Sequence, residues 1–295
     1  MTRKTLVIKI GALGDVLRTT PLLRRLSGSV TWVTDRRALP LLAGNRRIAR
    51  LLTPESGRAL RREKFDWIIN FDEDIRACAL AGSVDAKKKT GALLSSGKLV
   101  YCEASAPWFD MSLISRLGRK EADRRKYLGR KTYQHYLFKA CGFRFAGEEY
   151  MLPVPTPPAD GRPLIAIETR SGSRWPLKHW PGFAGLTKLL GKNGIDFFVL
   201  RQRKLLRDYI SDINRCTFLV SGDTLAMHIA LALRKRSAAV FNCTSPWEIH
   251  GYGRLRKFTH PRLRDLFYST RPPGKGLGSI PVSTVFKAVM ESLNL

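Results

Sequence analysis

Long hydrophobic runs are missing from this chain of 295 residues. The longest apolar stretches, Ala38–Ala43 and Ala77–Ala81, fall far short of the roughly 18 residues that cross a bilayer. Near the N-terminus, Lys9 interrupts the apolar residues that end at Ile8, so no hydrophobic core of a signal peptide is present. We therefore expect a soluble, cytoplasmic protein that is not exported.

Cysteine is scarce as well. The five cysteines are odd in number and widely scattered, and no C-x-x-C pair or zinc-type spacing of Cys and His occurs. We expect reduced thiols and no dedicated metal site. The acidic triplet Asp72, Glu73 and Asp74 follows an apolar run that ends at Phe71, a position typical of a turn and helix cap rather than of a metal site.

Acidic residues are the third shortage, with 24 Asp and Glu against 52 Lys and Arg, a formal net charge of +28. The excess is +15 in residues 1–150 (30 basic, 15 acidic) and +13 in residues 151–295 (22 basic, 9 acidic), so it is not confined to a tail. Such a charge favours polyanionic partners: nucleic acid, an anionic membrane or a phosphorylated glycan. Solubility alone is a second interpretation. Nucleic acid is the least favoured partner, because no helix-turn-helix, zinc or RNP motif is present.

Strand-like and helix-like patterns alternate along the chain, which predicts an α/β fold with parallel sheets. The alternation stops at Leu152–Pro163, where five prolines in twelve residues indicate a linker. We expect an N-terminal Rossmann-like domain over residues 1–151 and a second over residues 164–295, whose closing helix could return to the first. Ligands of such sheets bind outside the carboxyl ends of the strands.

The first candidate segment is KIGALGD, Lys9–Asp15, after an expected strand over Thr5–Ile10. Its G-x-x-G spacing lacks the dinucleotide fingerprint, and no Lys-Ser/Thr pair marks a P-loop. The segment is instead typical of a strand-to-helix turn, which brings the backbone close to a ligand and places Asp15 at the start of a helix. Two interpretations of Asp15 stay open here: a functional carboxylate, or an N-cap that accepts backbone N–H bonds.

The second and third candidates lie in the second unit. Glu168–Phe183 combines the small polar Ser173 with Arg170 and Lys178, a composition that suits diphosphate binding. A solvated basic loop is the other interpretation of this segment. Val220–Leu233 turns from strand to helix at its Ser-Gly-Asp-Thr sequence, where free N–H groups can face an anion. A capped core helix with a satisfied histidine is the other interpretation of that segment.

The fourth candidate is the basic run Arg116–Lys131, in which eight of sixteen residues are Lys or Arg and two are acidic. Charge runs of this kind usually form a solvated face. Phosphate binding is the second interpretation.

Four pieces of sequence resemble the ADP-heptose:lipopolysaccharide heptosyltransferases, the family 9 glycosyltransferases. They are KIGALGDVLRTTPLL at Lys9–Leu23, S-x-W-x-x-K-x-W-P at Ser173–Pro181, GDT-x-x-MH-x-A at Gly222–Ala230, and TSP followed by GYG within Thr244–Gly253. The resemblance spans both units. It implies the GT-B architecture, in which two Rossmann-like domains face each other across a cleft.

The resemblance also implies roles for single residues. Asp15 matches the general base, Lys178 the lysine that contacts the donor diphosphate, and Ser173 the phosphate loop. The start of the donor-binding helix is matched by Asp223, Thr224 and His228, and Leu225 belongs to the same expected donor-binding set although it departs from the family pattern. The implied reaction is an inverting displacement in which heptose leaves ADP, with no cofactor required and metal dependence undetermined.

Two departures from the family pattern concern the donor. Leu225 stands where relatives carry glycine, and its side chain narrows the space for a donor. Arg201, Gln202 and Arg203 stand where relatives commonly carry a Gly-rich turn and an acid, and an arginine cannot accept hydrogen bonds from a ribose. These departures favour the alternative function, a non-catalytic GT-B protein that binds an anionic glycan, lipid or nucleic acid.

The acceptor implied by the resemblance is an anionic glycolipid, which would place the protein at the inner face of the cytoplasmic membrane. The candidate acceptor-binding residues are Gly14 and Arg18, beside the expected base, and the basic Arg61, Lys120, Arg124 and Arg125.

Overall fold

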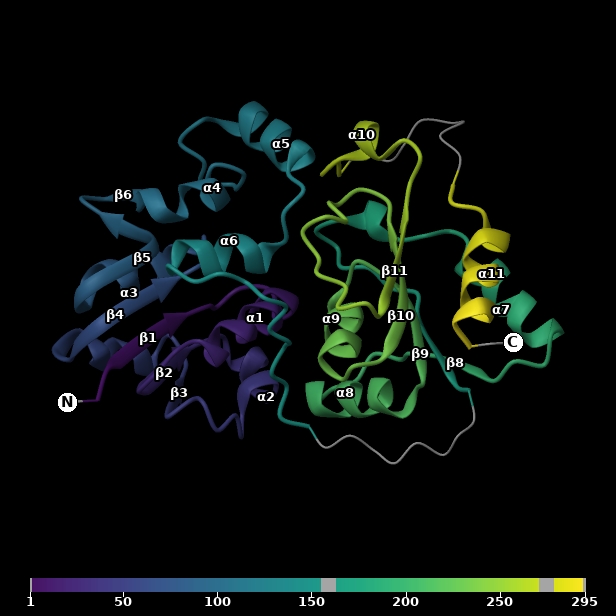
Figure 1. Ribbon diagram of the computed structural model, residues 1–295, viewed down its shortest axis with the longest axis horizontal. Helices are drawn as coiled ribbons and strands as arrows, with labels where there is room; N and C mark the ends of the chain where they lie inside the picture. Colours follow the sequence, from purple (N-terminus) through teal and green to yellow (C-terminus); the bar gives the residue numbers. More distant parts are fainter. Residues whose placement is uncertain (1, 155–162, 271–278, 294–295) are drawn as a thin grey trace. The chain divides into compact units, whose positions relative to one another are not determined.

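The computed structural model describes residues 2–154, 163–270 and 279–293 (Figure 1). The chain divides into two compact units, Met1–Pro153 and Val154–Leu295, and the division falls inside the Pro-rich segment expected as a linker. That segment lies largely outside the described residues. Each unit is an α/β domain built around its own sheet, and the predicted pair of Rossmann-like domains is confirmed.

The first unit has a six-stranded sheet in the order β3-β2-β1-β4-β5-β6, parallel except for the antiparallel β5–β6 pair. Its strands are β1 (Lys4–Ile8), β2 (Ser29–Val33), β3 (Arg50–Leu52), β4 (Lys64–Asn70), β5 (Asp85–Ser95) and β6 (Lys98–Tyr101). Its helices are α1 (Leu13–Thr19), α2 (Leu39–Leu42), α3 (Ile75–Ser83), α4 (Ala106–Phe109), α5 (Arg119–Leu128) and α6 (Tyr133–Ala140).

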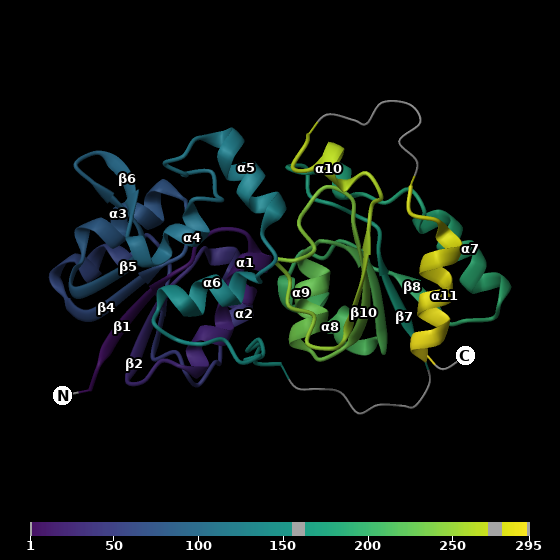
Figure 2. The ribbon, with the colours of Figure 1, turned by 45° about the horizontal axis from the view of Figure 1, so that its top comes forward.

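The core of this sheet explains the strands. Leu6 and Ile8 of β1 pack with Ile68 of β4 and with Ala77 and Leu80 of α3, all of them buried. Because β1 is central and buried on both faces, its sequence is a continuous apolar run and does not alternate between apolar and polar residues. In two views α5 stands apart from the sheet, beyond α4 and α6 (Figures 1 and 2).

The second unit has a fully parallel five-stranded sheet in the order β11-β10-β9-β7-β8. Its strands are β7 (Ile165–Glu168), β8 (Phe197–Val199), β9 (Phe218–Gly222), β10 (Arg236–Phe241) and β11 (Leu255–Thr259). Its helices are α7 (Phe183–Lys192), α8 (Leu206–Arg215), α9 (Leu225–Ala232), α10 (Leu263–Leu266) and α11 (Val282–Leu293).

The closing helix α11 buries Val285, Ala288 and Val289 in the core of its own unit, beside Leu186 and Leu190 of α7. These contacts account for the apolar face of α11. The sequence also left open the possibility that this helix packs on the first domain. Within the described ranges, no helix is both long enough and apolar enough to span a bilayer.

Candidate functional site

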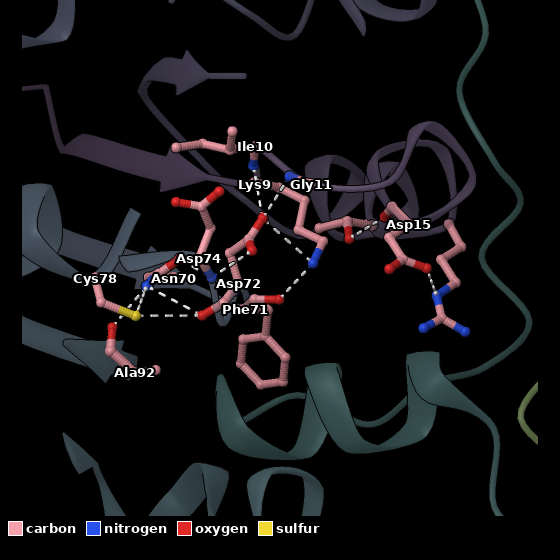
Figure 3. A network of polar contacts seen from close by, with 12 residues as sticks. Lys9, Ile10, Gly11, Asp15, Asn70, Phe71, Asp72, Asp74, Cys78 and Ala92 are labelled. Carbon is pink, nitrogen blue, oxygen red and sulfur yellow. Dashed lines mark hydrogen bonds and ion pairs between the residues drawn. The ribbon is translucent and has the colours of Figure 1, made fainter. Parts of the chain in front are cut away.

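The candidate site of the first unit is the loop Lys9–Gly14, which follows β1. Its anchor is Asp72, in the loop after the neighbouring strand β4, whose Oδ2 accepts hydrogen bonds from the backbone N–H of Ile10 at 2.8 Å and of Gly11 at 2.7 Å (Figure 3). The Lys9 ammonium lies 3.5 Å from the same oxygen and donates to the carbonyl of Phe71 at 2.8 Å. The two loops are thereby fixed to each other at the carboxyl ends of adjacent parallel strands.

Both members of the Lys9–Asp72 pair are buried, and both are charged at neutral pH. Burial disfavours the carboxylate of Asp72, but Lys9 and the backbone N–H donors outweigh it and hold the pKa of Asp72 at about 2. Burial likewise disfavours the Lys9 ammonium, but Asp72 and Asp15 outweigh it and raise the pKa of Lys9 to about 12. Asp72 is therefore a structural anchor, a role that was not predicted from the sequence. Asp74 is the N-cap of α3, as expected, and its side chain accepts a hydrogen bond from the backbone N–H of Arg76 at 2.8 Å.

Asp15 is the third residue of α1, which begins at Leu13 after an Ala12 N-cap, so the N-cap interpretation of Asp15 is wrong. Its carboxylate lies 3.0 Å from the Nε of Arg18, and about a third (35%) of its side chain is exposed. The Arg18 guanidinium is buried and stacks 4.2 Å from the ring centre of Tyr133. Asp15 therefore presents an ion-paired but accessible carboxylate beside Gly14, while Arg18 lies beneath it rather than on the open surface.

The other basic acceptor candidates occupy two elements. Lys120, Arg124 and Arg125 are exposed on α5, whereas Arg61 is exposed on a separate 3₁₀ helix at Ser56–Arg62. Arg124 pairs with Glu121 at 2.7 Å, and Arg125 pairs with the same carboxylate at 2.8 Å. The structure thus brings three of the four together and leaves Arg61 on a different element.

The candidate site of the second unit is an ion pair at the carboxyl end of β9. The Nζ of Lys178 lies 2.8 Å from Oδ2 of Asp223 and donates to the Asp223 carbonyl at 3.0 Å. The hydroxyl of Thr244 donates to the same Oδ2 at 2.8 Å. Burial disfavours the Asp223 carboxylate, but Lys178, His228 and the hydrogen bond from Thr244 outweigh it, so its pKa is held at about 2.

The backbone around this pair is close-packed. A Cβ at Gly222 would lie only 3.0 Å from the Lys178 carbonyl, so a larger residue there would push the loop of Lys178 away from β9 by a few tenths of an ångström. Thr224 is the N-cap residue of α9 and Leu225 its first residue, so the N-terminus of α9 adjoins Asp223, as predicted. Ser173 is exposed in the loop that precedes Lys178.

Three buried hydroxyl oxygens lie near this cluster in the sequence, those of Ser221, Thr224 and Ser245. None of them has a hydrogen-bond partner among the described protein atoms. Burying a hydroxyl without a partner costs free energy, so such groups mark a place where an oxygen-rich ligand can be bound. Ser221 and Ser245 lie in two of the segments singled out from the sequence, Val220–Leu233 and Thr244–Gly253, although neither was assigned a role.

Two arginines near the expected nucleotide site form ion pairs with acidic residues of the same unit. Arg203 pairs with Asp212 at 2.6 Å, and Arg170 makes a two-point contact with the buried Glu168 at 2.7 and 2.9 Å. Tyr209 donates to the same Glu168 carboxylate. Arg170 is therefore paired with Glu168 at the end of β7. Of the residues discussed here, Lys178, Ser173 and the start of α9 remain the candidates for phosphate binding.

Within the described part of the chain, no group of three or more His, Cys, Asp or Glu side chains is arranged to hold a metal ion. The cysteines there are free thiols, four of them buried.

The chain is therefore a two-domain Rossmann-like protein, and each sheet carries charged loops at the carboxyl ends of its central strands. No protein-family model and no curated protein matches the sequence. Solved structures do match it over nearly its whole length.

A family 9 glycosyltransferase from Veillonella parvula is 18% identical, with a TM-score of 0.69 over 99% of this chain and 97% of that one. The E. coli heptosyltransferase WaaC with ADP is 17% identical, with a TM-score of 0.64 over 98% and 99%. E. coli ADP-heptose lipopolysaccharide heptosyltransferase II is 16% identical, with a TM-score of 0.62 over 99% and 98%. The fold is thus the one that family 9 glycosyltransferases and heptosyltransferases have, as the resemblance implied.

Proposed function

We propose that this protein is an inverting glycosyltransferase that moves heptose from ADP-heptose to an anionic lipopolysaccharide-core acceptor. The observation that carries the proposal is the cluster of Lys178, Asp223 and Thr244 at the carboxyl end of β9, beside the N-terminus of α9. An ammonium held in place next to free helix N–H groups is suited to a diphosphate. The solved structures with the same fold include a heptosyltransferase with ADP.

In the proposed reaction, Asp15 accepts the proton of the acceptor hydroxyl as its oxygen attacks the anomeric carbon of the donor. The bond between that carbon and the phosphate oxygen breaks, and ADP leaves with the electron pair. Lys178 offsets the negative charge that develops on the leaving diphosphate. No covalent intermediate with the protein is required, and the configuration at the anomeric carbon is inverted.

The acceptor half of this proposal rests on charge. Lys120, Arg124 and Arg125 form an exposed basic group on α5 in the unit that carries Asp15. Phosphates and carboxylates of an inner-core glycan would pair with these side chains. The protein would work at the inner face of the cytoplasmic membrane, where anionic lipids attract the same residues.

The direct test is transfer of heptose from ADP-heptose to a lipid A precursor that carries acidic core sugars, with release of ADP as the readout. We expect turnover by the unaltered protein and loss of turnover in Lys178→Met, whose affinity for ADP also falls. ADP-heptose that binds without any turnover would contradict the proposal.

A second function is favoured by one specific observation. Leu225 is the first residue of α9, at the position where the family pattern carries glycine, and we expect a side chain there to leave less room for a nucleotide. A protein of this fold that holds an anionic glycan or lipid without turnover would retain the basic surface and lack donor binding. A thermal-shift series separates the two functions, because only the transferase is stabilised by ADP, by roughly 2.7 kcal/mol at 100 times its Kd.

A further inference from the structure

The segment that carries Lys178 has little structure of its own to fix its position. We call Trp175–Trp180 the Lys178 segment; it contains a 3₁₀ helix of three residues, Pro176–Lys178. Two backbone hydrogen bonds of 3.0 and 3.1 Å close the turns inside it. They shape the segment, but only bonds to other elements can place so short a turn within the unit.

One such bond comes from Asn242, the residue that follows strand β10. Its side-chain amide donates to the backbone carbonyl of His179 at 2.8 Å, and Asn242 is only 6% exposed. Because a carbonyl oxygen can only accept a hydrogen bond, the amide nitrogen of Asn242, and not its Oδ1, faces His179. Oδ1 is buried and has no hydrogen-bond partner among the described protein atoms.

A buried amide in this state adds little to stability. Burying a polar atom without a partner costs free energy comparable to what one hydrogen bond returns. An apolar side chain of similar size, such as leucine, would avoid that cost. The contribution of Asn242 is therefore to the position of the Lys178 segment, through the bond to His179.

The loop that begins at Asn242 also holds the partner of Lys178. Two residues further on, the hydroxyl of Thr244 donates to Oδ2 of Asp223 at 2.8 Å, and the same oxygen lies 2.8 Å from the Nζ of Lys178. One loop thus contacts the carboxylate of the ion pair at one point and the segment that carries the ammonium at another. The distance between the two charges depends on this loop.

This loop is itself anchored from outside. The backbone N–H of Tyr268 donates to the carbonyl of Cys243 at 2.8 Å. The ammonium of Lys257 in β11 donates to the carbonyls of Pro246 and Ile249 at 2.6 and 2.5 Å. The loop is therefore a fixed base for the contact with the Lys178 segment.

We propose that Asn242 is a positioning residue for diphosphate binding, which acts by holding Lys178 at a fixed place beside Asp223. Its amide does not contact the ligand; it holds the carbonyl of His179, the residue next to Lys178. An ammonium that is already in place requires no further ordering when a diphosphate binds, so the affinity is higher. The inference rests on the proposed function, which assigns the diphosphate to Lys178, and adds a residue that the proposed function does not include.

The first test is calorimetric titration of the full chain with inorganic pyrophosphate, a probe that has the diphosphate but neither base nor sugar. Asn242→Leu should lose about tenfold in affinity, an effect of the size of one hydrogen bond. The matched control is Asn193→Leu, which removes an exposed amide that donates to the carbonyl of Leu189 at 2.8 Å and should lose none. Equal affinities of Asn242→Leu and the unaltered protein would overturn the proposal.

A double-mutant cycle separates positioning from direct contact with the ligand. In a protein that already carries Lys178→Met, Asn242→Leu should cause no further loss of pyrophosphate affinity, because the group that Asn242 positions is gone. A further tenfold loss would overturn the proposal, since Asn242 would then act on the ligand itself. If Lys178→Met binds too weakly to measure, the ligand-free measurement that follows decides.

That measurement is the titration of the Asp223 carboxyl by carbon-13 NMR. Burial disfavours the Asp223 carboxylate, but Lys178 and its neighbours hold the pKa at about 2. In Asn242→Leu this pKa should be higher, because the ammonium is no longer held beside the carboxylate. An unchanged pKa would overturn the positioning role even if the affinity falls. If Asn242→Leu does not fold, Asn242→Ala, which adds no apolar bulk, replaces it in each measurement.

The proposed function and the positioning role fail separately. An unaltered protein that binds neither pyrophosphate nor ADP would refute the proposed function, while the Asp223 titration would still show whether Asn242 places Lys178. Pyrophosphate that binds equally well to Asn242→Leu would refute the positioning role alone.

Discussion

The ammonium of Lys178 lies 2.8 Å from the carboxylate of Asp223, in a position where both side chains are mostly buried. The pair couples the loop after β7 to the carboxyl end of β9. Because Thr244 donates to the same carboxylate oxygen, the pair also involves the loop after β10. Three loops of the second unit therefore share one charged centre, and the predictions for that unit start from it.

Lys178→Met should destabilise the protein and weaken ADP binding together. The substitution leaves Asp223 buried without its cation, a change that costs about 3 kcal/mol. Urea unfolding measures the stability and calorimetric titration measures the affinity for ADP. Lys188→Met on the surface of α7 is the matched control, and similar losses in both variants would contradict the role given to the pair.

Leu225→Gly should raise the affinity for ADP. Leu225 is the first residue of α9, and a glycine at that position would remove any side chain from the N-terminus of the helix, where N–H groups can face an anion. We expect several-fold tighter binding by calorimetry, against a small loss of helix stability. Unchanged or weaker binding would show that Leu225 does not limit access of the nucleotide.

Stability should fall on acidification as Asp72 and Asp223 are protonated. Both have a folded-state pKa of about 2, below the ordinary value of 3.8, so their contribution is complete above about pH 4 and is lost as the pH falls toward 2. Each shift corresponds to about 2 kcal/mol. Urea unfolding measured from pH 7 to pH 2 should show a shallower acid limb in Asp72→Asn. An unchanged slope would mean that the pKa of Asp72 is the same in the folded and the unfolded protein, which would contradict the lowered value.

Lys9→Met should lower the free energy of unfolding by about 3 kcal/mol, because Asp72 then keeps its backbone donors but loses its buried cation. The control is Lys64→Met, which removes an exposed lysine 3.9 Å from Asp85 and should cost less than about 0.5 kcal/mol. Equal effects of the two substitutions in urea unfolding would refute the anchoring role of Lys9.

Much of the fold could be predicted from local patterns, and the reason is burial. β1 and β9 are central, buried strands followed by glycine turns, so their apolar runs and turn residues are visible in the sequence. The strands β3, β5 and β11 were not predicted, because most of their residues are exposed or only partly buried and carry no clear apolar pattern.

The site was less predictable where its contacts join distant residues. Asp72 meets Lys9 only because β1 pairs with β4 in a register that sets Ile8 opposite Asn70, and no local pattern reports that register. The pairing of Glu168 with Arg170 was, by contrast, within reach of sequence reasoning, because the two residues are neighbours at the end of one strand. It was missed because a basic loop was interpreted through its charge alone.

The proposed base is tested most directly by a single-turnover measurement of heptose transfer from ADP-heptose by Asp15→Asn. The matched control is Asp85→Asn, which changes an exposed carboxylate in the same unit. We predict that Asp15→Asn binds ADP normally and transfers heptose about 10²- to 10⁴-fold more slowly, a loss of the order expected for a general base, while the control is unaffected. Transfer by Asp15→Asn at the rate of the unaltered protein would rule out Asp15 as the base.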